Sequence, residues 1–180
     1  FRIVMAPWST GIEWKTVGVY DQEKAAPLDS MLRIAEARGM HIQLAIDVSL
    51  GFDGIKSWDA EHPYTQFLKP GQTVSDLLKD SAAIAAFSEY FRYVHARWIN
   101  DPTVVNIEMM CEIFHWEGYE DHRKDFDDFF VMMHKLLRND LGDSLHLLSC
   151  SQIEGNLITG FRSDGMDYVD LHHYSNNYST

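Results

Sequence analysis

The chain has 180 residues, of which 46% are hydrophobic and 23% are charged, so it can bury the core of one globular domain. Lys and Arg number 15 and Asp and Glu number 27, and the resulting net charge of −12 repels the phosphate backbone of nucleic acids. No apolar run approaches the roughly 20 residues that cross a bilayer. The composition therefore argues against a disordered chain, a nucleic-acid-binding protein and a membrane-spanning protein.

Apolar segments typical of buried strands alternate with amphipathic helices in the first half of the chain. A strand is expected at 1–7, followed by a helix that begins near Pro27 and ends before Gly39. The next strand is expected at 41–47. A long connection at 48–80 then follows, and loops of this length in compact domains usually carry function or are disordered.

The second half of the chain continues the alternation. Ser81 is a candidate N-cap for a helix with an apolar stripe, and a further helix ends near Leu141. Three more apolar runs predict strands, at 103–110, 144–149 and 166–173. The chain thus alternates strands and helices, which is typical of an α/β fold with a parallel sheet.

Two α/β architectures compete for this pattern. A doubly wound sheet usually has a glycine-rich phosphate turn after its first strand, but the segment 7–14 contains only Gly11. A (β/α)8 TIM barrel carries its chemistry at the C-terminal ends of its strands, where this sequence gathers polar and aromatic residues. We therefore predict one domain, 1–180, that is an incomplete TIM barrel with about five of the eight βα units. We expect it to be part of a longer chain.

Glu112 is the main catalytic candidate, because it follows the expected strand at 103–110. With a period of two, Glu108, Met110 and Glu112 share one face, which puts Glu112 at the rim of the barrel. A carboxyl group among apolar and aromatic residues at that rim suits a general acid with a raised pKa. The same position suits a solvated residue that caps the next helix, and position alone favours neither interpretation.

Polar residues at two other strand ends are candidates for substrate contacts. Asp170, His172 and Tyr174 share one parity, so they form a column that runs to the same rim. Asp47 ends the expected strand at 41–47. Its position suits two roles equally well, a contact with substrate or an aspartate that forms a turn or caps a helix.

Four tryptophans fall in loops that follow expected strands, namely Trp8, Trp14, Trp58 and Trp116. An aromatic face can stack on the apolar face of a sugar ring while its edge stays hydrated. Any one of them could be a packing residue. Four on one side of the barrel, together with the acidic composition, indicate a neutral ligand such as a glycan.

No metal or cofactor site is predicted. Cys111 and Cys150 are too few for a disulfide framework and have no CxxC spacing, and the histidines form no HExxH pattern. The sequence leaves the oligomeric state open.

The segment 106–112, Asn-Ile-Glu-Met-Met-Cys-Glu, resembles the strand-four signature W-E-x-x-N-E of clan A glycoside hydrolases. The segments 2–14, 28–47 and 167–174 are similar to cellulase-like and mannanase-like barrels of that clan. The resemblance implies that the strands present are the second to the sixth of eight. It also implies that Glu112 is the acid/base of a retaining glycosidase, whose nucleophile is a glutamate on the seventh strand, outside this sequence.

The same resemblance implies that His172 and Tyr174, in a His-x-Tyr pattern, bind substrate and orient the acid/base. Cys111 departs from the pattern, because it replaces the asparagine that normally hydrogen-bonds the sugar 2-hydroxyl. A thiol is a much weaker donor than an amide, so this change lowers transition-state stabilisation unless another group compensates. Asn106 and Ile107 also differ from the residues that are common at these positions in the resembled family.

Three functions follow, in order of preference. The first is a retaining glycosidase that acts on a β-linked polysaccharide or oligosaccharide, for which these residues alone are expected to be inactive. The second is a carbohydrate-binding barrel that has lost catalysis. The third is a barrel enzyme of another chemistry, such as an aldolase, but Lys15, Lys56 and Lys69 all fall in loops and not on strands. Secretion or export to the cell envelope would suit a polysaccharide hydrolase, although the sequence leaves localisation open.

Overall fold

The structure is a computed structural model that describes residues 1–5, 11–13, 15–46, 62–113, 116–153 and 165–172. Within these residues, five parallel strands form one sheet in the order β1-β2-β3-β4-β5. The strands are β1 (Arg2–Val4), β2 (Ile42–Ala45), β3 (Val104–Glu108), β4 (Leu147–Ile153) and β5 (Tyr168–His172). Because the spatial order equals the chain order and all pairs are parallel, each of the strands β1 to β4 is followed by a crossover to the next strand.

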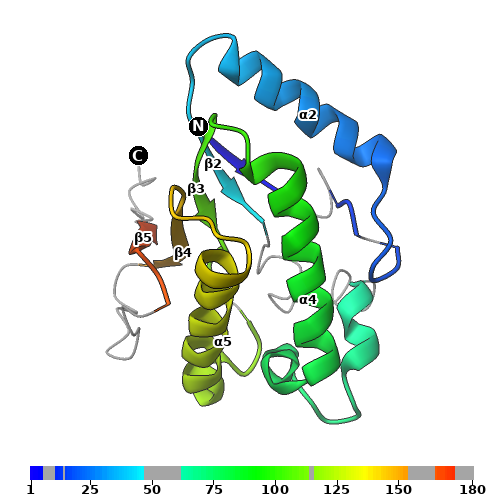
Figure 1. Cartoon of the computed structure of the whole chain (residues 1–180). Helices are drawn as coiled ribbons and strands as arrows, with labels where there is room; N and C mark the ends of the chain where they lie inside the picture. Colours follow the sequence, from blue (N-terminus) through cyan, green and yellow to red (C-terminus); the bar gives the residue numbers. More distant parts are fainter. Residues whose placement is uncertain (6–10, 14, 47–61, 114–115, 154–164, 173–180) are drawn as a thin grey trace, which may run out of the picture.

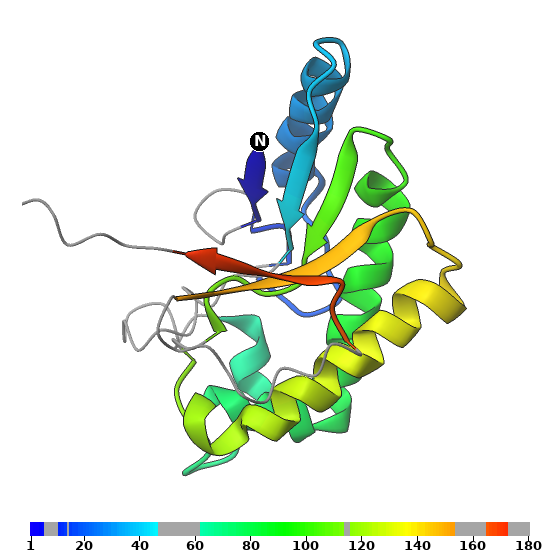
Figure 2. The same ribbon diagram turned by 90° about the vertical axis from the view of Figure 1, so that its left-hand side faces the viewer.

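Three helices provide the first three crossovers, and they lie along one side of the sheet (Figures 1 and 2). They are α2 (Gln22–Glu36), α4 (Ser81–Val94) and α5 (Arg123–Lys135). The π-helical turns η4 (His95–Ile99) and η7 (Leu136–Asp140) continue α4 and α5. Short 3₁₀ helices complete the helical layer, namely η2 (Pro63–Phe67), η3 (Val74–Lys79) and η6 (Tyr119–His122).

The helix starts differ from those expected from the sequence. Helix α2 begins five residues before Pro27, because the Asp21 side chain accepts hydrogen bonds from the first free backbone N–H groups, at Glu23 and Lys24. Asp80 caps α4 in the same way, so Ser81 is the first helical residue and not the N-cap. In both places an aspartate satisfies the amides that a helix start leaves unpaired.

Strand β4 is shifted toward the C-terminus relative to the expected run at 144–149. The side chain of Asp143 accepts hydrogen bonds from the backbone N–H groups of Leu145 and His146, which holds these residues in a turn. The strand therefore begins at Leu147 and continues to Ile153.

Alternate strand residues divide into an apolar set and a polar set. The apolar set packs beneath the helices and includes Leu44, Ile107 and Leu148, each with no exposed surface. Phe87 of α4 and Phe129 of α5 join above it, with ring centroids 5.3 Å apart in an edge-on arrangement. Side chains of successive strand residues point to opposite faces, so the polar set lies on the face away from the helices.

The parallel sheet and its helices confirm the α/β class, and closure into a TIM barrel stays a prediction. None of the helices described is long and apolar enough to cross a membrane.

Candidate active site

Glu112 lies just beyond the C-terminal end of β3, and its backbone has a left-handed φ of +53°. Few residues other than glycine adopt this conformation, and those that do are commonly held there by their surroundings. The backbone N–H of Glu112 donates a hydrogen bond of 2.9 Å to Oγ of Ser151 on the neighbouring strand β4. Ser151 is fully buried, so this contact fixes the start of the loop that carries the carboxyl group.

The Glu112 carboxyl group meets His172, the last residue of β5. Oε1 of Glu112 lies 2.7 Å from Nδ1 of His172, and the two side chains are 8% and 17% exposed. The structure thus brings together two of the residues that the sequence placed at one rim. A buried carboxyl group that is hydrogen-bonded to an imidazole can hold or pass a proton, which is the chemistry of a general acid/base.

A second carboxyl group, Glu108, belongs to a separate network deeper on the same face of the sheet. Nε and Nη2 of Arg2 donate to the two carboxylate oxygens of Glu108, each at 2.6 Å. Nε2 of Gln43 donates to Glu108 at 2.9 Å and to Asp170 at 3.1 Å. Burial opposes the charge of Arg2, but the hydrogen bond and charge of Glu108 outweigh burial, so the pKa of Arg2 is raised. Glu108 therefore forms a buried ion pair with Arg2.

Cys111 joins this network, which corrects the expected period of two. Its Sγ atom accepts a hydrogen bond from Nη2 of Arg2 at 3.0 Å, whereas Met110 lines an apolar pocket on the other side. The regular pairing of β3 ends at Glu108, so the alternation of faces does not continue to Glu112. Burial and the nearby charge of Glu108 raise the pKa of the Cys111 thiol, which keeps it protonated at neutral pH.

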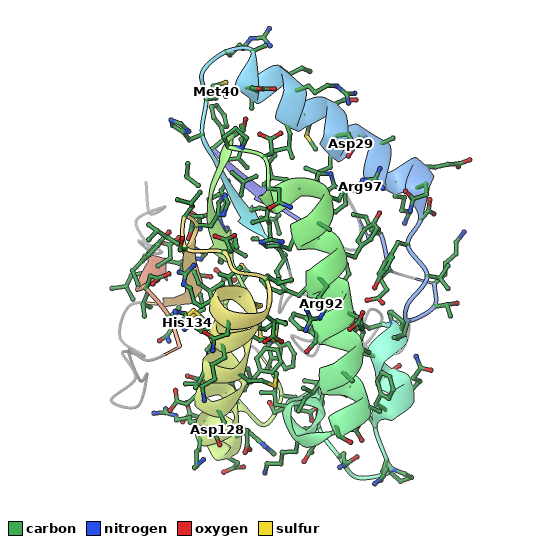
Figure 3. All side chains as sticks on the ribbon, in the orientation of Figure 1. Asp29, Met40, Arg92, Arg97, Asp128 and His134 are labelled. Atoms are coloured by element: carbon green, nitrogen blue, oxygen red, sulfur yellow. The ribbon has the colours of Figure 1, made fainter. Side chains whose placement is uncertain are left out.

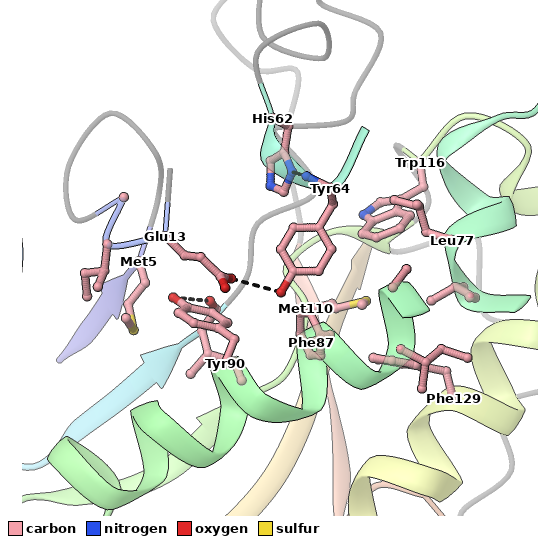
Figure 4. Close-up of a pocket in the computed structure, with 16 residues that line it drawn as sticks. Met5, Glu13, His62, Tyr64, Leu77, Phe87, Tyr90, Met110, Trp116 and Phe129 are labelled. Atoms are coloured by element: carbon pink, nitrogen blue, oxygen red, sulfur yellow. Dashed lines mark hydrogen bonds between the residues drawn. The ribbon is translucent and has the colours of Figure 1, made fainter. Parts of the chain in front are cut away.

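An apolar pocket with a cavity volume of about 70 Å³ lies between the sheet and the helices (Figure 4). Apolar side chains from segments far apart in the chain form its walls, among them Met5, Ile46, Leu77, Phe87, Met110 and Trp116. Trp116 is 4% exposed and packs edge-on against Phe126, with ring centroids 5.5 Å apart. This tryptophan therefore lies in the helical layer, and its predicted contact with sugar stays a prediction.

Polar groups also stand in the pocket wall, at Glu13, Tyr64 and His62. The hydroxyl group of Tyr64 donates a hydrogen bond of 2.9 Å to Oε2 of Glu13, and the backbone N–H of Gly18 donates to Oε1. Burial raises the pKa of Glu13, partly offset by these two donors. Burial also lowers the pKa of the nearby His62 to about 3, so that imidazole is uncharged at neutral pH.

Of the pocket residues, only Trp116 was predicted from the sequence to be functional. Arg2, Gln43 and Ser151 on the sheet were not predicted. Arg2 and Gln43 had one available signal, since each is a polar residue within an apolar strand. Ser151 lay outside the strand predicted at 144–149.

Five of the predicted residues lie outside the part of the chain that the structure describes, namely Trp8, Trp14, Asp47, Trp58 and Tyr174. Within the described part, no group of three or more His, Cys, Asp or Glu residues could hold a metal ion.

Comparisons with known proteins support the fold. Neither a protein-family model nor a curated protein matches the chain. Among solved structures, the chain is similar to endo-glycoceramidase II from Rhodococcus sp. in its lactosyl-enzyme intermediate, with 14% identity and a TM-score of 0.62 over 86% of this chain. Its complex with a cellobiose-like isofagomine gives 15% identity and a TM-score of 0.61 over 86% of this chain, and its ganglioside GM3 complex gives 14% and 0.59 over 83%.

These matches cover 41%, 42% and 40% of the endo-glycoceramidase chains, respectively. The chain thus spans well under half the length of the solved structures it resembles. At 14 to 15% identity, the similarity establishes a shared fold over that portion.

Proposed function

We propose that the protein is a retaining glycoside hydrolase in which Glu112 is the general acid/base. The observation that carries the proposal is the buried Glu112 carboxyl group bonded at 2.7 Å to His172, beyond the C-terminal ends of parallel strands. Enzymes built on parallel α/β sheets gather their catalytic groups at this edge. The similarity in fold to a glycosidase solved as a lactosyl-enzyme intermediate supports the same class of reaction.

In this proposal Glu112 first protonates the glycosidic oxygen of the leaving group, and then takes a proton from the water that hydrolyses the glycosyl-enzyme. His172 holds the carboxyl group in position through the hydrogen bond to Oε1 and stabilises its charged form between the two steps. Ser151 fixes the backbone from which the side chain projects.

The second carboxyl group of a retaining site lies about 5 to 5.5 Å from the first and acts as nucleophile. Glu108 is a poor candidate for this role, because both of its oxygens are bound by Arg2 and one also by Gln43. We propose that the nucleophile is a glutamate outside these 180 residues.

We propose β-linked sugars as the substrate, in a polysaccharide, an oligosaccharide or another glycoside. The candidate contacts beside Glu112 and His172 are the residues that the sequence analysis identified, namely Trp14, Asp47, Trp58, Cys111, Trp116 and Tyr174. The neighbours that bind a ganglioside and cellobiose-like inhibitors support a carbohydrate ligand.

One observation favours a second candidate function, a carbohydrate-binding protein without turnover. The Cys111 thiol is buried against Arg2 and stands where the resembled family has an asparagine that hydrogen-bonds the sugar. A protonated thiol stabilises the transition state poorly in that position.

The test compares sugar release by the protein in its natural full-length form with release by Glu112→Gln, using β-glucans, β-mannans and aryl β-glycosides. Glu36→Gln is the matched control, because Glu36 is an exposed glutamate on α2. We expect the Glu112 variant to lose activity by about 100-fold or more while it still binds glycans. Equal activity of both variants would contradict the role of Glu112, and glycan binding without release by the wild type would establish the binding protein.

A further inference from the structure

The segment 112–117, which we call the Glu112 loop, is held at both ends by buried serine hydroxyl groups. At its start, Oγ of Ser151 accepts the hydrogen bond from the backbone N–H of Glu112 at 2.9 Å. At its far end, Oγ of Ser75 donates a hydrogen bond of 2.7 Å to the backbone carbonyl of Glu117. Both serines have no exposed surface. Two elements that are far apart in the chain, β4 and η3, therefore fix the two ends of one short loop.

A hydrogen bond within the Glu112 loop shortens the path between the two anchors. The backbone N–H of Trp116 donates to the carbonyl of Ile113 at 3.1 Å, which is the pairing of a β-turn. Ile113 has no exposed surface and Trp116 is 4% exposed, so both residues are packed in the core. They are covalently joined to Glu112 and Glu117, respectively. Because a close-packed interior transmits strain, a shift of Glu117 is passed on to Glu112.

The element that carries Ser75 is itself held in place. Helix η3 begins with a capping box, in which Oδ2 of Asp76 accepts hydrogen bonds from the backbone N–H and the hydroxyl group of Thr73, at 2.8 and 3.2 Å. The other carboxylate oxygen of Asp76 lies 3.8 Å from Nε2 of His122 in η6. The start of η3 is therefore bound both to its own cap and to the element that follows the Glu112 loop.

Asp125, in the first turn of α5, connects η3 and η6. Its Oδ2 atom lies 2.9 Å from Nζ of Lys79, the last residue of η3, and 2.8 Å from Nδ1 of His122. Burial opposes the charge of Asp125, but the hydrogen bonds from Lys79 and His122 outweigh burial and lower its pKa. By contrast, Asp128 on the same helix is exposed to solvent (Figure 3). Helix η3 is thus fixed to the start of α5, and Ser75 is a firm support for the loop.

The chain is closely packed where η3 meets the end of the Glu112 loop. Gly118 follows Glu117 with a left-handed φ of +82°. A Cβ atom at this position would lie 2.5 Å from Oγ1 of Thr73, which is closer than non-bonded atoms approach. Both the backbone conformation and the contact therefore require glycine at position 118.

We propose that Ser75 is a positioning residue for the acid/base, an inference that rests on the proposed glycosidase function. Ser75 holds the far end of the Glu112 loop and Ser151 holds its start, and together they keep the Glu112 carboxyl group 2.7 Å from His172. The described part of the long connection, 62–80, thereby acts on catalysis through the loop. The aim of the carboxyl group matters, because a displacement of about 1 Å can lower a rate by about 100-fold.

The first experiment measures kcat and KM of the natural full-length protein on an aryl β-glycoside. Ser75→Ala removes the hydroxyl group that holds Glu117. Ser88→Ala is the matched control, because Oγ of Ser88 donates a bond of 2.8 Å to the carbonyl of Ile84 within α4. We expect Ser75→Ala to lower kcat by about tenfold with little change in KM, and Ser88→Ala to leave both constants unchanged. A lower melting temperature without a lower kcat would overturn the proposal.

A pair of glycine variants keeps the proposal testable if Ser75→Ala fails to fold. Gly118→Ala presses on Thr73 where η3 meets the loop. Gly71→Ala has the same backbone strain, at a φ of +85°, but its Cβ has no atom of the described residues within 4 Å apart from its chain neighbours. We expect only Gly118→Ala to lower kcat, by about tenfold. Equal values of kcat in the two variants would contradict the proposal.

A double-mutant cycle tests whether the two serines act through one loop. If Ser75 and Ser151 affected catalysis independently, the losses in kcat of the two single alanine variants would multiply in the double variant. If both hold the Glu112 loop, the second anchor matters less once the first is gone. We therefore expect the double variant to lose less than the product of the two single losses. A fully multiplicative loss would overturn the transmission through the loop.

The NMR signal of the His172 imidazole separates this inference from the proposed function, because recording it requires no substrate. We expect the signal to shift in Ser75→Ala, where the Glu112 carboxyl group moves away from the imidazole, and to stay constant in Ser88→Ala. A shift in a protein whose wild type releases no sugar would support the positioning of Glu112 by Ser75 and overturn the hydrolase. An active wild type with an unchanged signal and an unchanged kcat in Ser75→Ala would overturn the positioning and leave the hydrolase.

Discussion

Two regions at one edge of the sheet use opposite chemistry. On the face away from the helices, Glu108 and Glu112 are held by specific polar partners, through bonds of 2.6 to 2.9 Å. On the helical face, the pocket beside Met110 has mainly apolar walls. The change occurs between two adjacent residues, because Met110 faces the pocket while Cys111 faces Arg2. One short segment therefore separates a region where geometry is fixed by hydrogen bonds from one where shape is set by packing.

The largest expected effect on stability comes from breaking the ion pair on the polar face. The Glu108 carboxylate has no exposed surface, and Arg2→Met removes its main partner. We expect the free energy of unfolding to fall by about 3 kcal/mol. This value is at the lower end of the range for broken buried ion pairs, because the Arg2 side chain is 30% exposed.

The reverse change, Glu108→Gln, is the informative control. It leaves Arg2 unpaired, but this side chain can reach water, so we expect a loss of only about 1 kcal/mol. Urea unfolding of both variants measures the difference. Equal losses would show that the burial of Glu108 does not control the energetics of the pair.

The next effect tests a polar cluster far from the site. Asp143, before β4, accepts hydrogen bonds from backbone N–H groups of Leu145 and His146 and contacts the imidazoles of His95 and His146. Burial opposes its charge, but the hydrogen bonds outweigh burial and lower its pKa from 3.8 to about 2.

The pKa of Asp143 is lower in the folded state than in the unfolded state, so the ionised carboxylate stabilises the fold. This contribution to the free energy of unfolding is present above pH 3.8 and is lost as the pH falls toward 2. The shift in pKa corresponds to about 2 kcal/mol in the free energy of unfolding. Acid unfolding of the wild type and of Asp143→Asn, followed by circular dichroism, should differ in slope over this range. Parallel curves would contradict the prediction.

The smallest effect on stability distinguishes positioning from packing at the site. Ser149 and Ser151 lie on one strand and are both fully buried, but Ser149 accepts from Asn106 and Ser151 from the backbone of Glu112. Each change to alanine should cost about 1 kcal/mol. Only Ser151→Ala should lower kcat, by about tenfold or more, because it releases the backbone that aims the carboxyl group.

The NMR signal of the His172 imidazole, recorded in the two serine variants, gives a readout that does not depend on turnover. It should change in Ser151→Ala, where the Glu112 carboxyl group is displaced, and stay constant in Ser149→Ala. A change in both variants or in neither would argue against positioning by Ser151.

The sequence predicted the features that leave a periodic or local signal. Alternating strands and helices gave the α/β class, and strand parity placed His172 at the same edge as Glu112. The helix starts were missed because Asp21 and Asp80 cap through short-range hydrogen bonds that compete with the signals of Pro27 and Ser81.

Pairs of side chains far apart in the chain were beyond prediction. Arg2 and Glu108 are 106 residues apart, and Glu13 and Tyr64 are 51 apart, so neither contact follows from spacing. The pocket was missed for the same reason, since its walls come from distant segments that only the tertiary fold brings together. Met110 was assigned to the same face as Glu108 and Glu112, but it lines the pocket on the other side, because the strand period ends at Glu108.

The hydrogen bond from the Glu112 backbone to Ser151 has a further consequence, for amide hydrogen exchange. Glu112 lies outside the regular strand, yet its N–H is bound to a fully buried side chain, so it should exchange slowly with deuterated solvent. Its exchange rate reports how often this edge of the sheet opens. One amide thus serves as a built-in probe of local opening at the candidate acid/base.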